Sequence, residues 1–126
     1  MDNILIEGNK QQPTIDFDAQ TGQLSISGRS IPENSYEFYN PLLLWLDDYK
    51  ENAMETTKVK IHLEYFNTSS SKYILEVLKK IKEMHAQGKN VEIAWHYDED
   101  DEEMMETGED YEDIIGIDFN YIAEEE

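Results

Sequence analysis

The fold is decided in the stretch Leu63–Glu76, LEYFNTSSSKYILE, where one pattern of apolar residues gives way to another. Apolar and polar residues alternate up to Phe66, and a helical spacing of apolar residues begins shortly after Ser71. Asn67 and a run of hydroxyl-bearing residues stand between the two patterns. A strand that leads almost directly into a helix is the repeating unit of α/β proteins.

The periods of the two patterns identify the elements on either side. Alternation over residues 58–66 predicts a β-strand. Its inward-facing residues are Val59, Ile61, Leu63 and Tyr65. The helical spacing predicts a helix from about Ser70 to Gln87 that ends at Gly88 as its C-terminal cap. The apolar stripe of this helix consists of Ile74, Leu75, Leu78, Ile81 and His85.

The N-terminal part of the chain predicts a β-hairpin followed by a helix. Residues 14–18 and 24–27 alternate around the turn sequence AQTG, and residues 4–6 indicate a further short strand. Asn34 is followed three residues later by Glu37, a capping-box pattern that predicts a helix running through Tyr49. Pro41 lies inside this helix, so we expect a kink or a helix restarted at Asn40.

The C-terminal part predicts two more strands and a helix. The strands are expected over residues 91–97 and 116–122, with a helix near 99–106 in the acidic connection. Strands that alternate with helices imply right-handed crossovers. We therefore predict an α/β fold with a mixed, mostly parallel sheet of about five strands and three helices packed on it. At 126 residues, we expect one domain spanning residues 1–126.

The charge balance limits the partners that the chain can bind. The formal net charge is −19, with ten Lys and Arg against 29 Asp and Glu. This field repels nucleic acids and anionic membrane surfaces, so we expect neither as a partner. There is no cysteine, no secretory leader pattern in MDNILIEG and no apolar run long enough to span a bilayer. We expect a soluble, cytoplasmic protein.

The hydroxyl run Asn67–Ser71 has two interpretations. Asn, Ser and Thr are common helix N-caps, which explains one or two of the five residues. The alternative is a phosphorylation site, because the N-terminus of a helix tolerates negative charge. A phosphate there would oppose partner binding, since an interface would have to bury its charge.

A second loop, RSIPENSYEFY, is expected at the same edge of the sheet. It contains the single arginine of the chain, Arg29, and follows a strand, as the hydroxyl run does. Partners of open α/β sheets gather at the carboxyl ends of parallel strands. We therefore expect the two loops to form one partner-binding surface. Its residues would be Arg29, Ser30, Pro32, Glu33, Asn34, Ser35, Asn67, Thr68, Ser69 and Ser70.

Within the acidic segment of residues 98–113, an alternative function is a divalent-cation-binding module centred on residues 98–109. Asp98, Asp100, Glu102, Glu106 and Glu109 fall at ligand positions of an EF-hand loop. Position 6 of such a loop should be glycine, and it is Glu103 here. We prefer a solvated or partner-facing acidic segment, and we also expect a short acidic tail at residues 123–126.

The sequence contains no convincing enzyme motif. There is no G-x-S-x-G elbow, P-loop or G-x-G-x-x-G, so we predict no cofactor and no catalytic residue. The histidines His62, His85 and His96 are scattered, which favours structural roles. A small hydrolase that pairs Ser69 or Ser70 with one of them is a remaining alternative.

Three stretches together resemble the SiaC family of bacterial regulatory phosphoproteins. They are GRSIPENSYEFYNPLLLWL, LEYFNTSSSKYILEVL and VEIAWHYDEDDEEM, and the likeness extends from about Ile15 to Phe119. The resemblance implies a fold similar to the STAS domains of anti-sigma-factor antagonists. It also implies a non-enzymatic switch that is phosphorylated on the threonine of the L-N-T-S-S motif, here Thr68. Because three serines follow, Ser69 and Ser70 are alternative sites.

The same resemblance implies the partners. A kinase with a histidine-kinase-type ATP-binding fold would add the phosphate, and a PP2C-type phosphatase would remove it. The unphosphorylated family members bind and activate a diguanylate cyclase and so promote biofilm formation. The cyclase is the least transferable part of this expectation, because a shared fold does not determine a partner.

Overall fold

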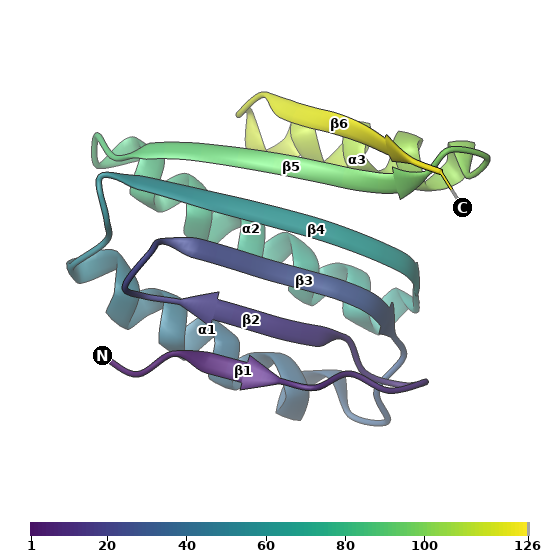
Figure 1. Cartoon of the computed structure of the whole chain (residues 1–126), viewed down its shortest axis with the longest axis horizontal. Coiled ribbons are helices and arrows are strands. Elements are labelled where there is room, and N and C mark those ends of the chain that lie inside the picture. Colours follow the sequence, from purple (N-terminus) through teal and green to yellow (C-terminus); the bar gives the residue numbers. More distant parts are fainter. Residues whose placement is uncertain (126) are drawn as a thin grey trace.

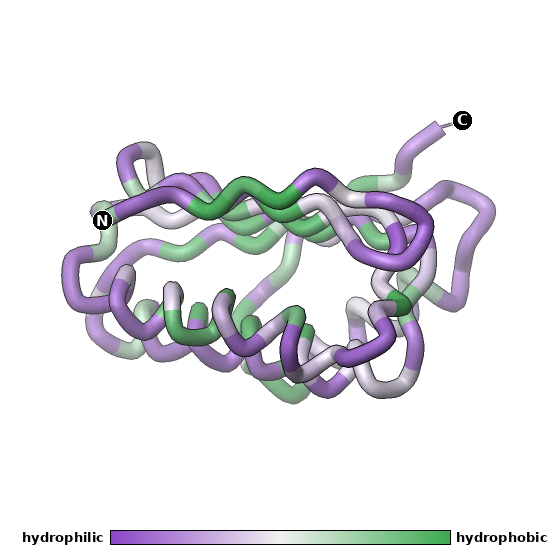
Figure 2. Tube along the Cα trace, turned by 90° about the horizontal axis from the view of Figure 1, so that it is seen from below, coloured by the Kyte–Doolittle hydropathy of each residue, from purple (hydrophilic) through white to green (hydrophobic). Residues whose placement is uncertain are grey.

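A computed structural model describes residues 1–125 and contains a sheet covered by helices on one face only (Figure 1). The strands are β1 (Ile4–Ile6), β2 (Thr14–Asp18), β3 (Gln23–Ser30), β4 (Thr56–Phe66), β5 (Asn90–Asp98) and β6 (Phe119–Glu124). The helices are α1 (Ser35–Glu51), α2 (Thr68–Ala86) and α3 (Glu102–Ile115). Viewed along the sheet, the strands form one layer and the helices the other (Figure 2).

The strands lie in the sheet in the order of the sequence, β1-β2-β3-β4-β5-β6. The pairs β1–β2 and β2–β3 are antiparallel, and the pairs from β3 to β6 are parallel. The predicted α/β class, with a mostly parallel sheet and an antiparallel pair at one edge, is confirmed. The sheet has six strands instead of about five, because residues 4–6 form β1.

Each parallel pair is joined by one helix, and the helices bury their apolar stripes against the sheet. α1 buries Leu42, Trp45, Leu46 and Tyr49, and α2 buries Ile74, Val77, Leu78, Ile81 and Met84. These side chains meet the inward-facing residues of β2–β5 in one continuous core. The opposite face of the sheet carries no helix and is polar. Within residues 1–125, no helix is both long and apolar enough to cross a membrane.

Several predicted boundaries need correction. α1 runs through Pro41 without a restart at Asn40, and Pro41 lies on its exposed side. α2 begins at Thr68, two residues before the predicted start, because Asn67 is its N-cap. His85 is exposed, and the buried stripe passes through Met84 instead.

The phase of β4 changes near its end, which places Tyr65 on the other side of the strand. Gly28 of β3 pairs with Leu63, but the next residue, Arg29, pairs with Tyr65, so Glu64 is an extra residue in β4. A β-bulge of this kind breaks the alternation of side chains. Tyr65 is 51% exposed, and the prediction that it faces inward is wrong.

The acidic connection forms a longer and later helix than predicted. α3 is capped by Asp101, whose side chain accepts from the Met104 amide, and it ends at Gly116 in the left-handed conformation. The helix packs closely on Trp95, since a Cβ at Gly108 would lie 2.6 Å from the indole. The last strand starts at Phe119 and not at Gly116. Of the predicted acidic tail, Glu126 lies outside the described residues.

Candidate functional site

Three helices begin at the same edge of the sheet, where β3, β4 and β5 end (Figure 1). The connections are short: residues 31–34 join β3 to α1, Asn67 alone joins β4 to α2, and residues 99–101 join β5 to α3. The carboxyl ends of parallel strands are where α/β proteins usually place their binding sites. This edge therefore brings together the two predicted loops.

Asn67 organises the start of α2. Its side-chain carbonyl accepts from the Ser70 amide at 2.9 Å and from the Ser69 hydroxyl at 3.1 Å. Its own amide donates to the Ser30 carbonyl at 3.1 Å. Asn67 is thus an N-cap that also attaches the turn to the end of β3.

Thr68 is exposed on the outer side of this turn. Its hydroxyl takes part in none of the hydrogen bonds formed among residues 1–125. Ser69 is also exposed, but its hydroxyl lies 2.7 Å from the Ser35 hydroxyl. Thr68 is therefore more available to a modifying enzyme than Ser69.

Ser70 lies on the inner side of the turn and is fully buried. Its hydroxyl donates to the Ser30 carbonyl at 3.0 Å and accepts from the Ser30 hydroxyl at 2.8 Å. The Ser30 hydroxyl is also 2.6 Å from the phenol of Tyr39, which is buried in α1. A kinase cannot reach Ser70 in this conformation, which argues against Ser70 as the alternative phosphoacceptor.

The buried cluster of Ser30, Tyr39 and Ser70 joins three elements of the fold. Burial raises the pKa of the Tyr39 phenol to about 12, so it stays protonated at physiological pH. Every buried side-chain polar atom in the described part of the chain has a hydrogen-bond partner. The cluster thus holds β3, α1 and α2 together directly beneath the exposed turn.

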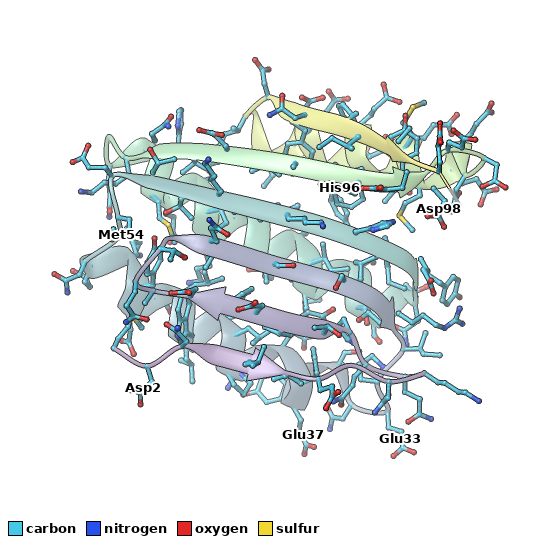
Figure 3. The ribbon with its side chains drawn as sticks, in the orientation of Figure 1. Asp2, Glu33, Glu37, Met54, His96 and Asp98 are labelled. Atoms are coloured by element: carbon cyan, nitrogen blue, oxygen red, sulfur yellow. The ribbon has the colours of Figure 1, made fainter. Side chains whose placement is uncertain are left out.

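The two predicted loops are in contact through these bonds. Ser35 reaches Ser69 at the surface, and Ser30 reaches Asn67 and Ser70 below it. Asn34 caps α1 by accepting from the Glu37 amide at 3.1 Å. Glu33 and Glu37 extend outward beside this contact (Figure 3). Pro32 and Glu33 also line an open hollow of about 480 Å³, together with Gln11 and Gln12.

Exposed aromatic and basic side chains border the turn. Arg29 was predicted to belong to the partner-binding surface, whereas Tyr36 and Tyr65 were not. Arg29 faces away from Ser30, and its guanidinium lies 5.7 Å from the centre of the Tyr65 ring. On the helical side, Tyr36 is 57% exposed and packs on Tyr73, which stacks on Tyr39. Exposed tyrosine and arginine side chains are enriched at protein interfaces.

The described acidic segment does not form an EF-hand loop. Asp98 ends β5 and lies 3.3 Å from His62, while residues from Glu102 onward, including Glu109, lie along α3. A calcium loop must wrap its ligands around the ion, whereas a straight helix spreads them apart. Among residues 1–125, no three His, Asp or Glu side chains, Asp100 included, are grouped to hold a metal ion.

The hydrolase alternative fails on geometry. The hydroxyls of Ser69 and Ser70 are engaged with Asn67, Ser35 and Ser30. His62 pairs with Asp98, and His96 pairs with Glu124 on the uncovered face of the sheet (Figure 3). His85 lies in the last turn of α2, at the opposite end of the helix from both serines. Among residues 1–125, neither serine therefore has the histidine base that a nucleophile would need.

The chain was compared with known protein families and structures. The sequence profile of the SiaC family of regulatory phosphoproteins matches residues 6–124. An uncharacterized protein of Pseudomonas aeruginosa strain UCBPP-PA14 is 32% identical over 126 residues and aligns over 100% of both chains.

Solved structures extend this similarity to three dimensions. Apo-SiaC of Pseudomonas aeruginosa superposes with a TM-score of 0.88 at 32% identity, over 98% of this chain and 100% of that one. A chain in the crystal structure of the diguanylate cyclase SiaD with its activator SiaC, also from Pseudomonas aeruginosa, superposes with a TM-score of 0.90 at 32% identity. That match covers 96% of this chain and 99% of the other.

Proposed function

Because the chain belongs to the SiaC family of regulatory phosphoproteins, we propose that it is a non-enzymatic, cytoplasmic switch whose phosphoacceptor is Thr68. The observation that carries the proposal is the position of Thr68. It is an exposed hydroxyl without a partner among the described residues, in the first turn of α2 where two loops meet. A kinase would transfer the γ-phosphoryl group of ATP to the Thr68 oxygen, releasing ADP and the hydroxyl proton.

The docking surface consists of the two connected loops, residues 29–35 and 67–70. Its floor is rigid because the Ser30, Tyr39 and Ser70 cluster is buried and fully bonded. A partner that binds here would cover Thr68. Phosphorylation would then place a charge of about −1.5 to −2 in the interface, where desolvation costs several kcal/mol. Each 1.4 kcal/mol weakens binding tenfold, so the modification suffices to release the partner.

The partners proposed for this chain follow from its relatives. The SiaC protein of Pseudomonas aeruginosa is described as the activator of the diguanylate cyclase SiaD. We propose a diguanylate cyclase as the target of the unphosphorylated chain. A kinase with a histidine-kinase-type ATP-binding fold and a PP2C-type phosphatase would set its phosphorylation state.

The first test is the intact mass of the protein purified from its own cells, with and without phosphatase treatment, followed by fragmentation. A phosphatase-sensitive gain of roughly 80 Da located on Thr68 is expected, since this is the mass of one phosphate. A gain on Ser69 would move the site, and no gain under any growth condition would refute the switch.

The second test measures binding to the diguanylate cyclase encoded in the same genome. Thr68→Ala should bind as the unmodified chain does, and Thr68→Asp should bind at least tenfold more weakly. Thr21→Asp is the matched control, because Thr21 is exposed in the β2–β3 turn at the opposite edge of the sheet. Equal affinities of Thr68→Ala and Thr68→Asp would contradict the proposal.

A further inference from the structure

Lys72 is a cation near Thr68 that has no anionic partner among residues 1–125. It follows Thr68 by four residues on α2, and side chains four residues apart are neighbours on a helix surface. Lys72 is exposed, and its ammonium lies 5.4 Å from the centre of the Tyr73 ring. It takes part in none of the ion pairs formed among residues 1–125.

We propose that Lys72 is the residue that receives the phosphate of Thr68, an inference that rests on the proposed function. A phosphothreonine N-terminal to a lysine by four residues has the favourable order for a helical ion pair. The competing carboxylate on this face is Glu76, which is four residues C-terminal to Lys72, the less favourable order. Glu76 also already lies 3.6 Å from the ammonium of Lys79.

An ion pair between Lys72 and the phosphate would also change the aromatic surface around the turn. Lys72 now covers the Tyr73 ring, and Tyr73 packs between Tyr36 and Tyr39, with ring centres 6.5 and 5.8 Å apart. When the ammonium turns toward the phosphate, it leaves this ring. Phosphorylation would then alter both the charge and the aromatic exposure of the docking surface.

The test uses the full chain with phosphothreonine incorporated at position 68, so that it does not depend on the cellular kinase. Titration by ³¹P NMR gives the second pKa of the phosphate, which is ordinarily near 6. Lys72→Gln should raise that pKa by about 0.2–0.4 unit, since the lysine favours the dianion by the energy of one helical ion pair. Lys79→Gln is the control, on the same helix but eleven residues from Thr68, and should leave the value unchanged.

A second readout follows the lysine itself. The ammonium of Lys72 lies over the Tyr73 ring, so ring current should shift the adjacent ε-methylene protons upfield in the unmodified chain. Phosphorylation of Thr68 should move them downfield.

An unchanged phosphate pKa in Lys72→Gln, or Lys72 protons that do not respond to phosphothreonine, would overturn the inference. These outcomes are distinct from failure of the switch, which would appear as an unphosphorylated Thr68 in cells or as cyclase binding that ignores the phosphate.

Discussion

Hydroxyl side chains lie on both the inner and the outer side of the first turn of α2, but they are buried on the inner side and exposed on the outer side. On the inner side, Ser70 is fully buried and shares two hydrogen bonds with Ser30. On the outer side, Thr68 is exposed and its hydroxyl is unpaired among the described residues. Two residues apart, one hydroxyl is structural and the other is available for chemistry. The difference arises from burial and not from residue type.

This arrangement lets one helical turn be both rigid and modifiable. The inner hydroxyl attaches the turn to β3 and, through Ser30, to Tyr39 of α1. The outer hydroxyl can then gain a phosphate without any buried bond being broken. A charge on the inner side should therefore unfold the edge, whereas a charge on the outer side should not.

The largest expected effect comes from placing the same negative charge on the inner and on the outer side of the turn. Ser70→Asp should lower the free energy of unfolding by about 3–5 kcal/mol, because the carboxylate is buried without a cation. Thr68→Asp should leave stability unchanged or raise it by about 0.3–1 kcal/mol, because it places negative charge at a helix N-terminus. Urea denaturation measures both, and similar losses in the two variants would contradict the inner and outer assignment.

The pH dependence of stability tests the inner side through Tyr39. Its pKa is raised from 10.0 to about 12 in the folded protein, mainly by burial. Below pH 10 the tyrosine is protonated in both states and its contribution to stability is complete. As pH rises from about 10 to 12, the unfolded state loses the proton first, so stability falls by about 1.4 kcal/mol per pH unit.

Tyr39→Phe should remove the part of the alkaline loss of stability that comes from Tyr39. Burial also raises the pKa of Tyr111, so the wild-type slope has more than one source. The relevant quantity is therefore the difference in the free energy of unfolding between wild type and Tyr39→Phe. If the two stability curves stayed parallel from pH 10 to 12, the raised pKa of Tyr39 would be disproved.

Removal of the Ser30 hydroxyl tests whether the buried cluster holds β3, α1 and α2 together. Ser30→Ala leaves the Tyr39 phenol without its partner at 2.6 Å and should cost about 1–3 kcal/mol. Ser27→Ala, on the same strand but half-buried, should change stability by less than about 0.5 kcal/mol. Thermal unfolding of the two variants gives the comparison, and equal effects would argue against a special role for Ser30.

The smallest expected effect on stability is that of removing Asn67, the N-cap of α2. Asn67→Ala removes the acceptor of the Ser70 amide and the Ser69 hydroxyl and should cost about 1 kcal/mol. Hydrogen exchange of residues 68–71 should increase with it, while Asn34→Ala should affect the start of α1 instead. An unaltered first turn in Asn67→Ala would show that the buried cluster alone holds α2.

Local patterns predicted much of this architecture because their causes are local. The capping pattern at Asn34 and the hairpin turn at Gly22 each depend on residues within a few positions of one another, and both are present. The alternation of strands and helices, together with the right-handed crossover, was enough to predict the parallel sheet.

The errors have non-local causes. Tyr65 faces outward because a bulge opposite Gly28 shifts the phase of β4. α3 starts later than predicted and continues past Gly108, where the absence of a Cβ lets the helix pack on Trp95. The acidic segment has the residue spacing of a metal loop, but the helix spreads these carboxylates apart.

The sequence by itself determined the start of α1, the class of the fold and the turn that carries Thr68. These features follow from side chains that bond to backbone groups within about one turn. Only the tertiary structure decided which hydroxyl is buried and which is exposed. Ser30 and Ser70 are 40 residues apart, as are Tyr111 and the Ser71 carbonyl to which its phenol donates. Burial depends on what packs from the other layer, and no local pattern contains that information.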